Sequence, residues 1–364
     1  IVAFADYAAT WQTNAVTVSP NGTEKIGSVN ADVSLTTEGQ SVTFVYVDST
    51  QGWINTMDST SNVRGNPNLV ATVSGACNTL VTAPCCANVK IATFTGPGDF
   101  TVTNAATCAA NNLVSYMVVA GGAGGGVGGG GAGGFREYKS PVTPYTASPL
   151  DGNPGGTAVT VSATAYPITV GGGGAAKPNS PTAVQGNTGS NSIFSSITSA
   201  GGGGGGGYYG PSPNTNITHG QDGGSGGGGG AWNSPSNTEP GGAGDTPNVT
   251  PDQGNSGGNG SYQVSTHTAG GGGGGAGAVG AASPSGGAPT PGIGGAGGAG
   301  VTTSITSSAV ARAGGGGGGA NSPGPAPAGG TGGGGTGGNP ASLNGGNGTT
   351  NTGSGGGGEN TGGA

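Results

Sequence analysis

The sequence predicts an all-β protein in which modules of short strands precede a long glycine-rich part. Glycine supplies 92 of the 364 residues, but only eight glycines lie in residues 1–120 and the other 84 lie in residues 121–364. Short runs rich in Val, Ile, Thr and aromatic residues recur, as is typical of strands. No stretch has the 3.6-residue apolar period of a helix, which glycine and proline would destabilise by about 1 and 3 kcal/mol each. We therefore divide the chain into residues 1–60, 61–120 and 121–364.

The first two parts are predicted to be β-rich. Seven strand-like runs lie at residues 1–5, 15–19, 41–48, 69–74, 89–95, 100–103 and 113–120. The run at 41–48 is apolar on both faces, with Val42 and Phe44 on one and Val45 and Val47 on the other. Such a strand needs cover on both sides, which either two packed layers or an association of three chains would supply. Trp53 is expected in the core of this module.

All four cysteines lie in the second part, at Cys77, Cys85, Cys86 and Cys108. Zinc ligands usually come in pairs separated by two or more residues, whereas Cys85 and Cys86 are adjacent. Residues 1–120 contain no histidine. The pattern favours disulfides or unreactive thiols over a metal site, and it leaves the pairing open.

From residue 121 the chain alternates between glycine runs and segments rich in Pro, Asn, Ser and Thr. The runs lie at residues 121–134, 171–174, 201–207, 223–230, 270–275, 314–319, 329–338 and 355–358. Three of the intervening segments contain strand-like words, at residues 158–170, 193–199 and 301–310. The repetition is imperfect and lacks the strict three-residue glycine period of collagen.

The glycine runs allow two structural interpretations. One is a flexible linker. The other is a bundle of extended threefold helices of the polyproline II type, also called polyglycine II, in which neighbouring backbones hydrogen-bond to one another. Residues 121–364 contain only 11 charged side chains, and aliphatic residues such as Val127, Val279 and Ile293 interrupt or flank the runs; both facts favour the bundle. Runs of 6–14 residues would form rods about 20–40 Å long.

Several classes of function are disfavoured by composition and motifs. The net charge of −7 and only seven Lys plus Arg argue against nucleic acid as a partner. No run approaches the ~20 apolar residues of a membrane-spanning helix. The acidic residues are scattered without a catalytic pair, and His219 and His267 have only Asp222 nearby. We therefore expect no catalytic residues, no metal, no cofactor and no enzymatic activity.

Aromatic residues in polar segments are the candidates for ligand binding. Tyr208, Tyr209, Trp232 and Tyr262 follow or flank glycine runs among Asn, Ser and Gly. Exposed rings among hydrogen-bonding side chains suit sugar recognition, by stacking and hydrogen bonding. The alternative is that each ring caps the end of a rod and shields its backbone hydrogen bonds.

Two groups of sequence words resemble bacteriophage tail fibres. The first comprises residues 4–11 (FADYAATW), 14–18 (NAVTV) and 42–53 (VTFVYVDSTQGW), which resemble a β module of such fibres. The second comprises residues 93–102 (TFTGPGDFTV), 116–120 (YMVVA), 165–171 (AYPITVG) and 192–195 (SIFS), which resemble the glycine-rich domain of phage fibres and fibre-tip adhesins.

This resemblance implies a homotrimeric fibre in the virion whose polyglycine II bundle presents loops to the host. The implied partners are copies of the same chain, other fibre or tail proteins, and a host surface polysaccharide or outer-membrane protein. The glycine-rich part could form either the tip or an internal element of the fibre. The alternative function is a bacterial extracellular filament or sheath protein with a purely structural role.

Overall fold

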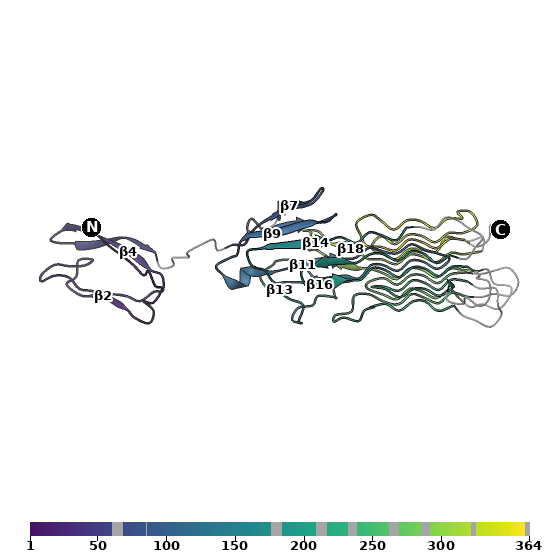
Figure 1. Ribbon diagram of the computed structural model, residues 1–364. Coiled ribbons are helices and arrows are strands. Elements are labelled where there is room, and N and C mark those ends of the chain that lie inside the picture. Colours follow the sequence, from purple (N-terminus) through teal and green to yellow (C-terminus); the bar gives the residue numbers. More distant parts are fainter. Residues whose placement is uncertain are drawn as a thin grey trace. The chain divides into compact units, whose positions relative to one another are not determined.

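The computed structural model describes residues 1–59, 68–84, 86–175, 184–208, 217–231, 239–261, 269–284, 292–321 and 325–360 (Figure 1). The chain forms two units. The first comprises Ile1–Leu69 with Ala106–Ala109, and the second comprises Val70–Ala105 with Ala110–Ala364. Throughout the described ranges strands prevail, and helical structure is confined to the four-residue 3-10 turn η1 and to Ile217. The predicted all-β class is confirmed.

The first unit contains two antiparallel sheets. One has the strand order β1-β4-β5, and β2 pairs with β3 in the other. The strands are β1 (Val2–Ala5), β2 (Val16–Val18), β3 (Val33–Leu35), β4 (Ser41–Asp48) and β5 (Gly52–Ser59). The polar strand β5 and the short strand β3 were not expected from the sequence, because neither is a clear apolar run.

One face of β4 forms the core of this unit. Val42 and Phe44 are buried with Trp11 and Leu35. Trp53 is partly buried and packs against this cluster. Farther along β4, Tyr46 and Val47 are 44% and 55% exposed, so the far end of this strand lacks the cover that its sequence calls for.

A buried aspartate, Asp6, joins two loops of the first unit. Its carboxylate accepts hydrogen bonds of 3.0 Å from the backbone N–H groups of Thr10, Trp11 and Gly39. Burial by itself raises the pKa of Asp6, but the backbone hydrogen bonds together outweigh burial and hold the pKa below its usual value. The ionised form therefore stabilises the folded unit.

We expect Asp6→Asn to destabilise the first unit at neutral pH. Because the folded-state pKa is lowered, the stabilisation is fully present above about pH 4, the ordinary pKa of an aspartate, and is lost as the pH falls through the lowered value. Urea unfolding followed by the fluorescence of Trp11 and Trp53 measures this. The difference between wild type and variant should shrink in acid, and the exposed control Asp32→Asn should show no such difference. Equal pH dependence of wild type and Asp6→Asn would contradict the assignment.

The second unit begins with a set of antiparallel sheets. The largest has the strand order β16-β15-β14-β9-β6, and four two-stranded sheets pair β7 with β8, β10 with β13, β11 with β12 and β17 with β18. The elements are β6 (Val70–Val73), β7 (Thr79–Thr82), β8 (Lys90–Thr93), β9 (Gly98–Asn104), η1 (Ala109–Asn112), β10 (Leu113–Val114), β11 (Tyr116–Val119), β12 (Phe135–Tyr138), β13 (Val159–Thr160), β14 (Ala165–Thr169), β15 (Ser192–Phe194), β16 (Ile197–Ser199), β17 (Val301–Thr303) and β18 (Val310–Arg312). Strands of residues 61–120 thus share sheets with strands of residues 121–364.

Beyond these strands, extended glycine-rich segments run side by side (Figure 1). The segment at residues 128–134 reveals their geometry through its hydrogen bonds. The N–H groups of Gly128, Gly131 and Gly134 bond to the carbonyls of Gly206, Gly203 and Ala200 in one neighbouring segment. Those of Gly129 and Ala132 bond to Gly271 and Gly274 in a second neighbour, and those of Gly130 and Gly133 bond to Gly356 and Gly353 in a third. Every third residue therefore bonds to the same neighbour. This is the threefold period of polyglycine II.

The same segment also accepts hydrogen bonds from three further neighbours. The donors to Gly129, Gly130 and Gly131 are Gly228, Gly316 and Ala123, each from a different segment. Six backbones thus surround this central rod. An added Cβ at Gly129 would lie 2.1 Å from the Gly316 carbonyl oxygen, so close approach of backbones, and not a special φ angle, requires glycine here.

The longest glycine run is folded back on itself. The N–H groups of Ala120, Ala123 and Gly126 bond to the backbone carbonyls of Gly134, Gly131 and Gly128. The run is a hairpin that continues the antiparallel pair β11–β12. The expectation of a single rod of about 40 Å is therefore wrong for this run, and each arm is about 20 Å long at 3.1 Å per residue.

A small apolar core and a buried glutamate lie where the strands continue into the rods. Phe135 is fully buried with Ala132, Ala276, Ala313 and Val301. Glu137, on β12, is 2% exposed. It accepts hydrogen bonds from the Ser148 N–H at 2.9 Å and from the Thr303 hydroxyl at 2.5 Å.

The charge of Glu137 affects two partly buried neighbours. Burial, followed by the charge and hydrogen bonding of Glu137, raises the pKa of Tyr145 well above its usual value. Burial lowers the pKa of Arg312, and Glu137 opposes that shift. The carboxylate therefore links β12 to residues 145–148 and to the β17–β18 pair.

Candidate functional site

The ends of the rods farthest from the strands meet in one place, which we call the loop end. Its residues are connected by single β-bridges, namely Tyr208 with Ala231, Glu239 with Gly260, Ser261 with Ala269, and Ala269 with Ala320. Hydrogen bonds close to the bridges join the same segments. Gly230 N–H bonds to the Thr218 carbonyl, and Gly229 N–H bonds to the Gly258 carbonyl. The loop end therefore brings together residues that directly precede or follow several polar segments in the sequence.

The four aromatic residues predicted to bind a ligand are either bridged themselves or adjacent in the sequence to a bridged residue. Tyr208 is itself bridged to Ala231 and is partly buried. Tyr209, Trp232 and Tyr262 lie outside the described residues. Each of the three directly follows a bridged residue, Tyr208, Ala231 or Ser261. The sequence predicted these aromatic residues from residue type alone. That the bridged residues beside them, Tyr208, Ala231 and Ser261, lie at the same end of the bundle is visible only in the folded chain.

A buried acidic residue that the sequence did not indicate also lies at the loop end. Glu239 is almost fully buried, and its Oε2 atom accepts a hydrogen bond from the Thr218 hydroxyl. The same oxygen lies 3.7 Å from Nε2 of His219, whose side chain is 40% exposed. Twenty residues separate His219 from Glu239, so spacing along the chain does not reveal the pair. One acid and one imidazole fasten two anchoring segments together but do not form a complete catalytic or ligand set.

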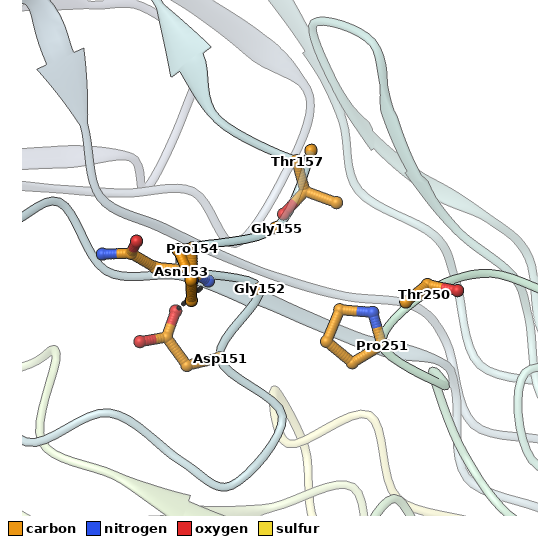
Figure 2. A pocket seen from close by; sticks show the side chains of 9 residues that line it. Asp151, Gly152, Asn153, Pro154, Gly155, Thr157, Thr250 and Pro251 are labelled. Atoms are coloured by element: carbon orange, nitrogen blue, oxygen red, sulfur yellow. Dashed lines mark hydrogen bonds between the residues drawn. The ribbon is translucent and has the colours of Figure 1, made fainter.

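A shallow pocket of about 370 Å³ lies in the second unit between the loop at residues 151–157 and Thr250–Pro251 (Figure 2). Its one carboxylate, on Asp151, accepts hydrogen bonds from the backbone N–H groups of Lys139 and Asn153 through Oδ1. Hydrolysis of a glycosidic bond usually requires two carboxyl groups, and the lining of this pocket supplies one. The pocket therefore offers no acid–base pair.

The cysteines give no site within the described ranges. Cys77 and Cys108 are exposed free thiols, and Cys86 is half-buried. Cys85 lies outside the described residues, so the prediction of disulfides among the four stays a prediction. Where the structure describes the chain, no three His, Cys, Asp or Glu side chains cluster closely enough to hold a metal ion. The helical structure in those ranges is too short and too polar to cross a membrane.

Comparison with known proteins identifies the glycine-rich part. A family described as a glycine-rich domain matches residues 95–364. No curated protein and no solved structure matches the chain. The matched range begins just before β9 and includes all the rods.

Proposed function

Because the chain belongs to the glycine-rich domain family over residues 95–364, we propose that it is a structural and adhesive component of a bacteriophage tail fibre. In this proposal, copies of the chain assemble into a fibre, the bundle serves as a rigid support, and the loop end attaches to the host surface. The ligand is a surface polysaccharide or an outer-membrane protein. The chain has no catalytic role.

The observation that carries the proposal is the convergence of anchoring residues at the loop end. Tyr208, Ala231 and Ser261 are held by β-bridges, and each precedes an aromatic residue in the sequence. Binding sites built on rigid elements lose less entropy when they bind. Aromatic residues are also prominent among the residues that contribute most to binding. The resemblance of residues 4–53 to a fibre module supports the virion as the location.

Replacing the loop-end aromatics should weaken attachment. We expect the triple variant Tyr209→Ala, Trp232→Ala, Tyr262→Ala to reduce the adsorption rate of the virion to its host at least tenfold, because aromatic residues that dominate binding contribute about 2 kcal/mol each. Adsorption is measured by the loss of free virions from a suspension of host cells. The strongly exposed Tyr7 of the first unit provides the control Tyr7→Ala, which should adsorb normally.

Two results would count against attachment through the loop end. Normal adsorption by a triple variant that incorporates into virions and unfolds at the wild-type temperature would remove the adhesive role. Recovery of the chain as a long polymer on cells, without virions, would instead favour a purely structural extracellular filament.

A further inference from the structure

The outer rods of the bundle usually carry side chains at the positions that face solvent. In residues 292–300 the sequence is GIGGAGGAG, and Ile293 and Ala296 are exposed while most of the intervening glycines are buried. The adjoining segment exposes Val279 and Ala282, and Ala281 N–H bonds to the Ala296 carbonyl. A side chain is thus present where no neighbouring backbone approaches.

The rod at residues 171–174 departs from this pattern. Gly172 and Gly173 are both exposed. An added Cβ on Gly172 would have no atom within 4 Å, and one on Gly173 would have its nearest atom at 3.5 Å. At Gly171 and Gly174, by contrast, the added Cβ would lie 1.9 and 2.0 Å from a carbonyl oxygen. The fold of the single chain therefore requires glycine at the ends of this rod but not at its two middle positions.

Some backbone groups on the same rod have no partner among the residues that the structure describes. Gly171 N–H bonds to the Ser192 hydroxyl and Gly174 N–H to the Gly122 carbonyl. Within the part of the chain that the structure describes, the N–H groups of Gly172 and Gly173 and the carbonyl of Gly173 make no hydrogen bond. Two donors and one acceptor are thus exposed on this rod, and another copy of the same rod offers the groups that can bond to them.

An exposed glycine whose φ angle any residue can adopt is unfavourable, since a side chain would restrict the unfolded chain at no steric cost. At Gly129, Gly171 and Gly174, by contrast, glycine lies where another extended backbone comes close. We propose that residues 171–174 form the surface through which copies of this chain associate, backbone against backbone. The association resembles the pairing of exposed edge strands.

The threefold geometry indicates in which directions the rod is open. Successive residues of such a rod point about 120° apart, so Gly172 and Gly173 face two different directions while Gly171 and Gly174 share the third. Each of the two open directions can accept the backbone of another copy.

This inference deepens the proposed function and rests on the self-association within it. The test uses the purified full chain and measures its mass by native mass spectrometry and light scattering over a range of concentrations. We expect the wild type to self-associate. The variant Gly172→Leu, Gly173→Leu should be a folded monomer whose assembly requires at least 100-fold higher concentration. The control Gly156→Leu, at an exposed loop position with no atom within 4 Å of the added Cβ, should associate as the wild type does.

The outcomes separate this inference from the adhesive role. A wild-type monomer at the highest concentration, or a variant that assembles as tightly as the wild type, would each overturn the proposed surface. The stability of the variant monomer, measured by thermal unfolding, should equal or exceed that of the control. The mass of the loop-end triple variant should be unchanged, so failure in adsorption and failure in assembly are distinguishable.

Discussion

Replacing Gly129 by alanine is expected to destabilise the glycine-rich bundle by about 3 kcal/mol or more, at the upper end of the cost of overpacking a protein interior. The new Cβ would lie 2.1 Å from the Gly316 carbonyl oxygen and 2.9 Å from the Gly273 nitrogen. Both are backbone atoms of rods that are themselves hydrogen-bonded on other sides. A rotamer change therefore cannot relieve the clash, and a rod has to move.

Displacement of one rod also disturbs its hydrogen bonds. Gly129 N–H bonds to Gly271, and Gly228 N–H bonds to the Gly129 carbonyl. Buried backbone groups that lose their partners cost about 1–3 kcal/mol each. The effect of this single methyl group should therefore exceed that of most alanine substitutions elsewhere in the chain.

Denaturant unfolding with a probe of the second unit measures the effect. The matched control is Gly156→Ala, where the added Cβ would have no atom within 4 Å. That variant should be unchanged or slightly stabilised. Equal midpoints for the two variants would mean that the rods are not packed as closely as their hydrogen bonds indicate.

The second large effect is expected for Glu137→Ala, which should destabilise the second unit by about 3 kcal/mol. The substitution leaves the Ser148 N–H without its acceptor in a buried site, and the Thr303 hydroxyl keeps only the more distant Thr146 carbonyl. It also opens a cavity at the base of the rods and removes the anion near the partly buried Arg312. Each of these consequences is unfavourable in a region closed to water.

The matched variant Glu137→Gln distinguishes hydrogen bonding from simple filling of space. Glutamine has the same shape, but only one of its two terminal atoms accepts hydrogen bonds. It should therefore destabilise the unit by less than alanine does, and by a measurable amount. Urea unfolding of the three proteins provides the comparison. If glutamine and wild type had equal stability, the carboxylate would contribute only its volume.

Much of the fold follows from the sequence because it depends on local chemistry. The strand at Ser41–Asp48 was predicted with the bounds that the structure has, since its run of β-branched and aromatic residues is unambiguous. The glycine runs form packed rods, as low charge and interrupting aliphatic residues indicated. The outward positions of one outer rod can even be recognised in the GIGGAGGAG pattern at residues 292–300, because one direction in three carries a side chain.

Contacts between residues far apart in the sequence could not be predicted from the sequence. Nothing in a run of glycines specifies where it reverses, so the hairpin at Gly126–Gly128 depends on which backbones surround it. The strand Phe135–Tyr138 contains Arg136 and Glu137, and only the hydrogen bonds from residues 148 and 303 make burial of that glutamate possible.

The candidate site was likewise predicted in part from the sequence and in part became visible only in the tertiary structure. The sequence by itself determined the composition break, the all-β class, the polyglycine character and the aromatic residues beside the runs, because these depend on residue type and local spacing. Only the tertiary structure decided that Tyr208, Ala231 and Ser261 meet at one end of the bundle and that Glu239 lies beside His219. The physical reason is that polyglycine rods have no internal hydrogen bonds, so each takes its position from the neighbours that satisfy its backbone.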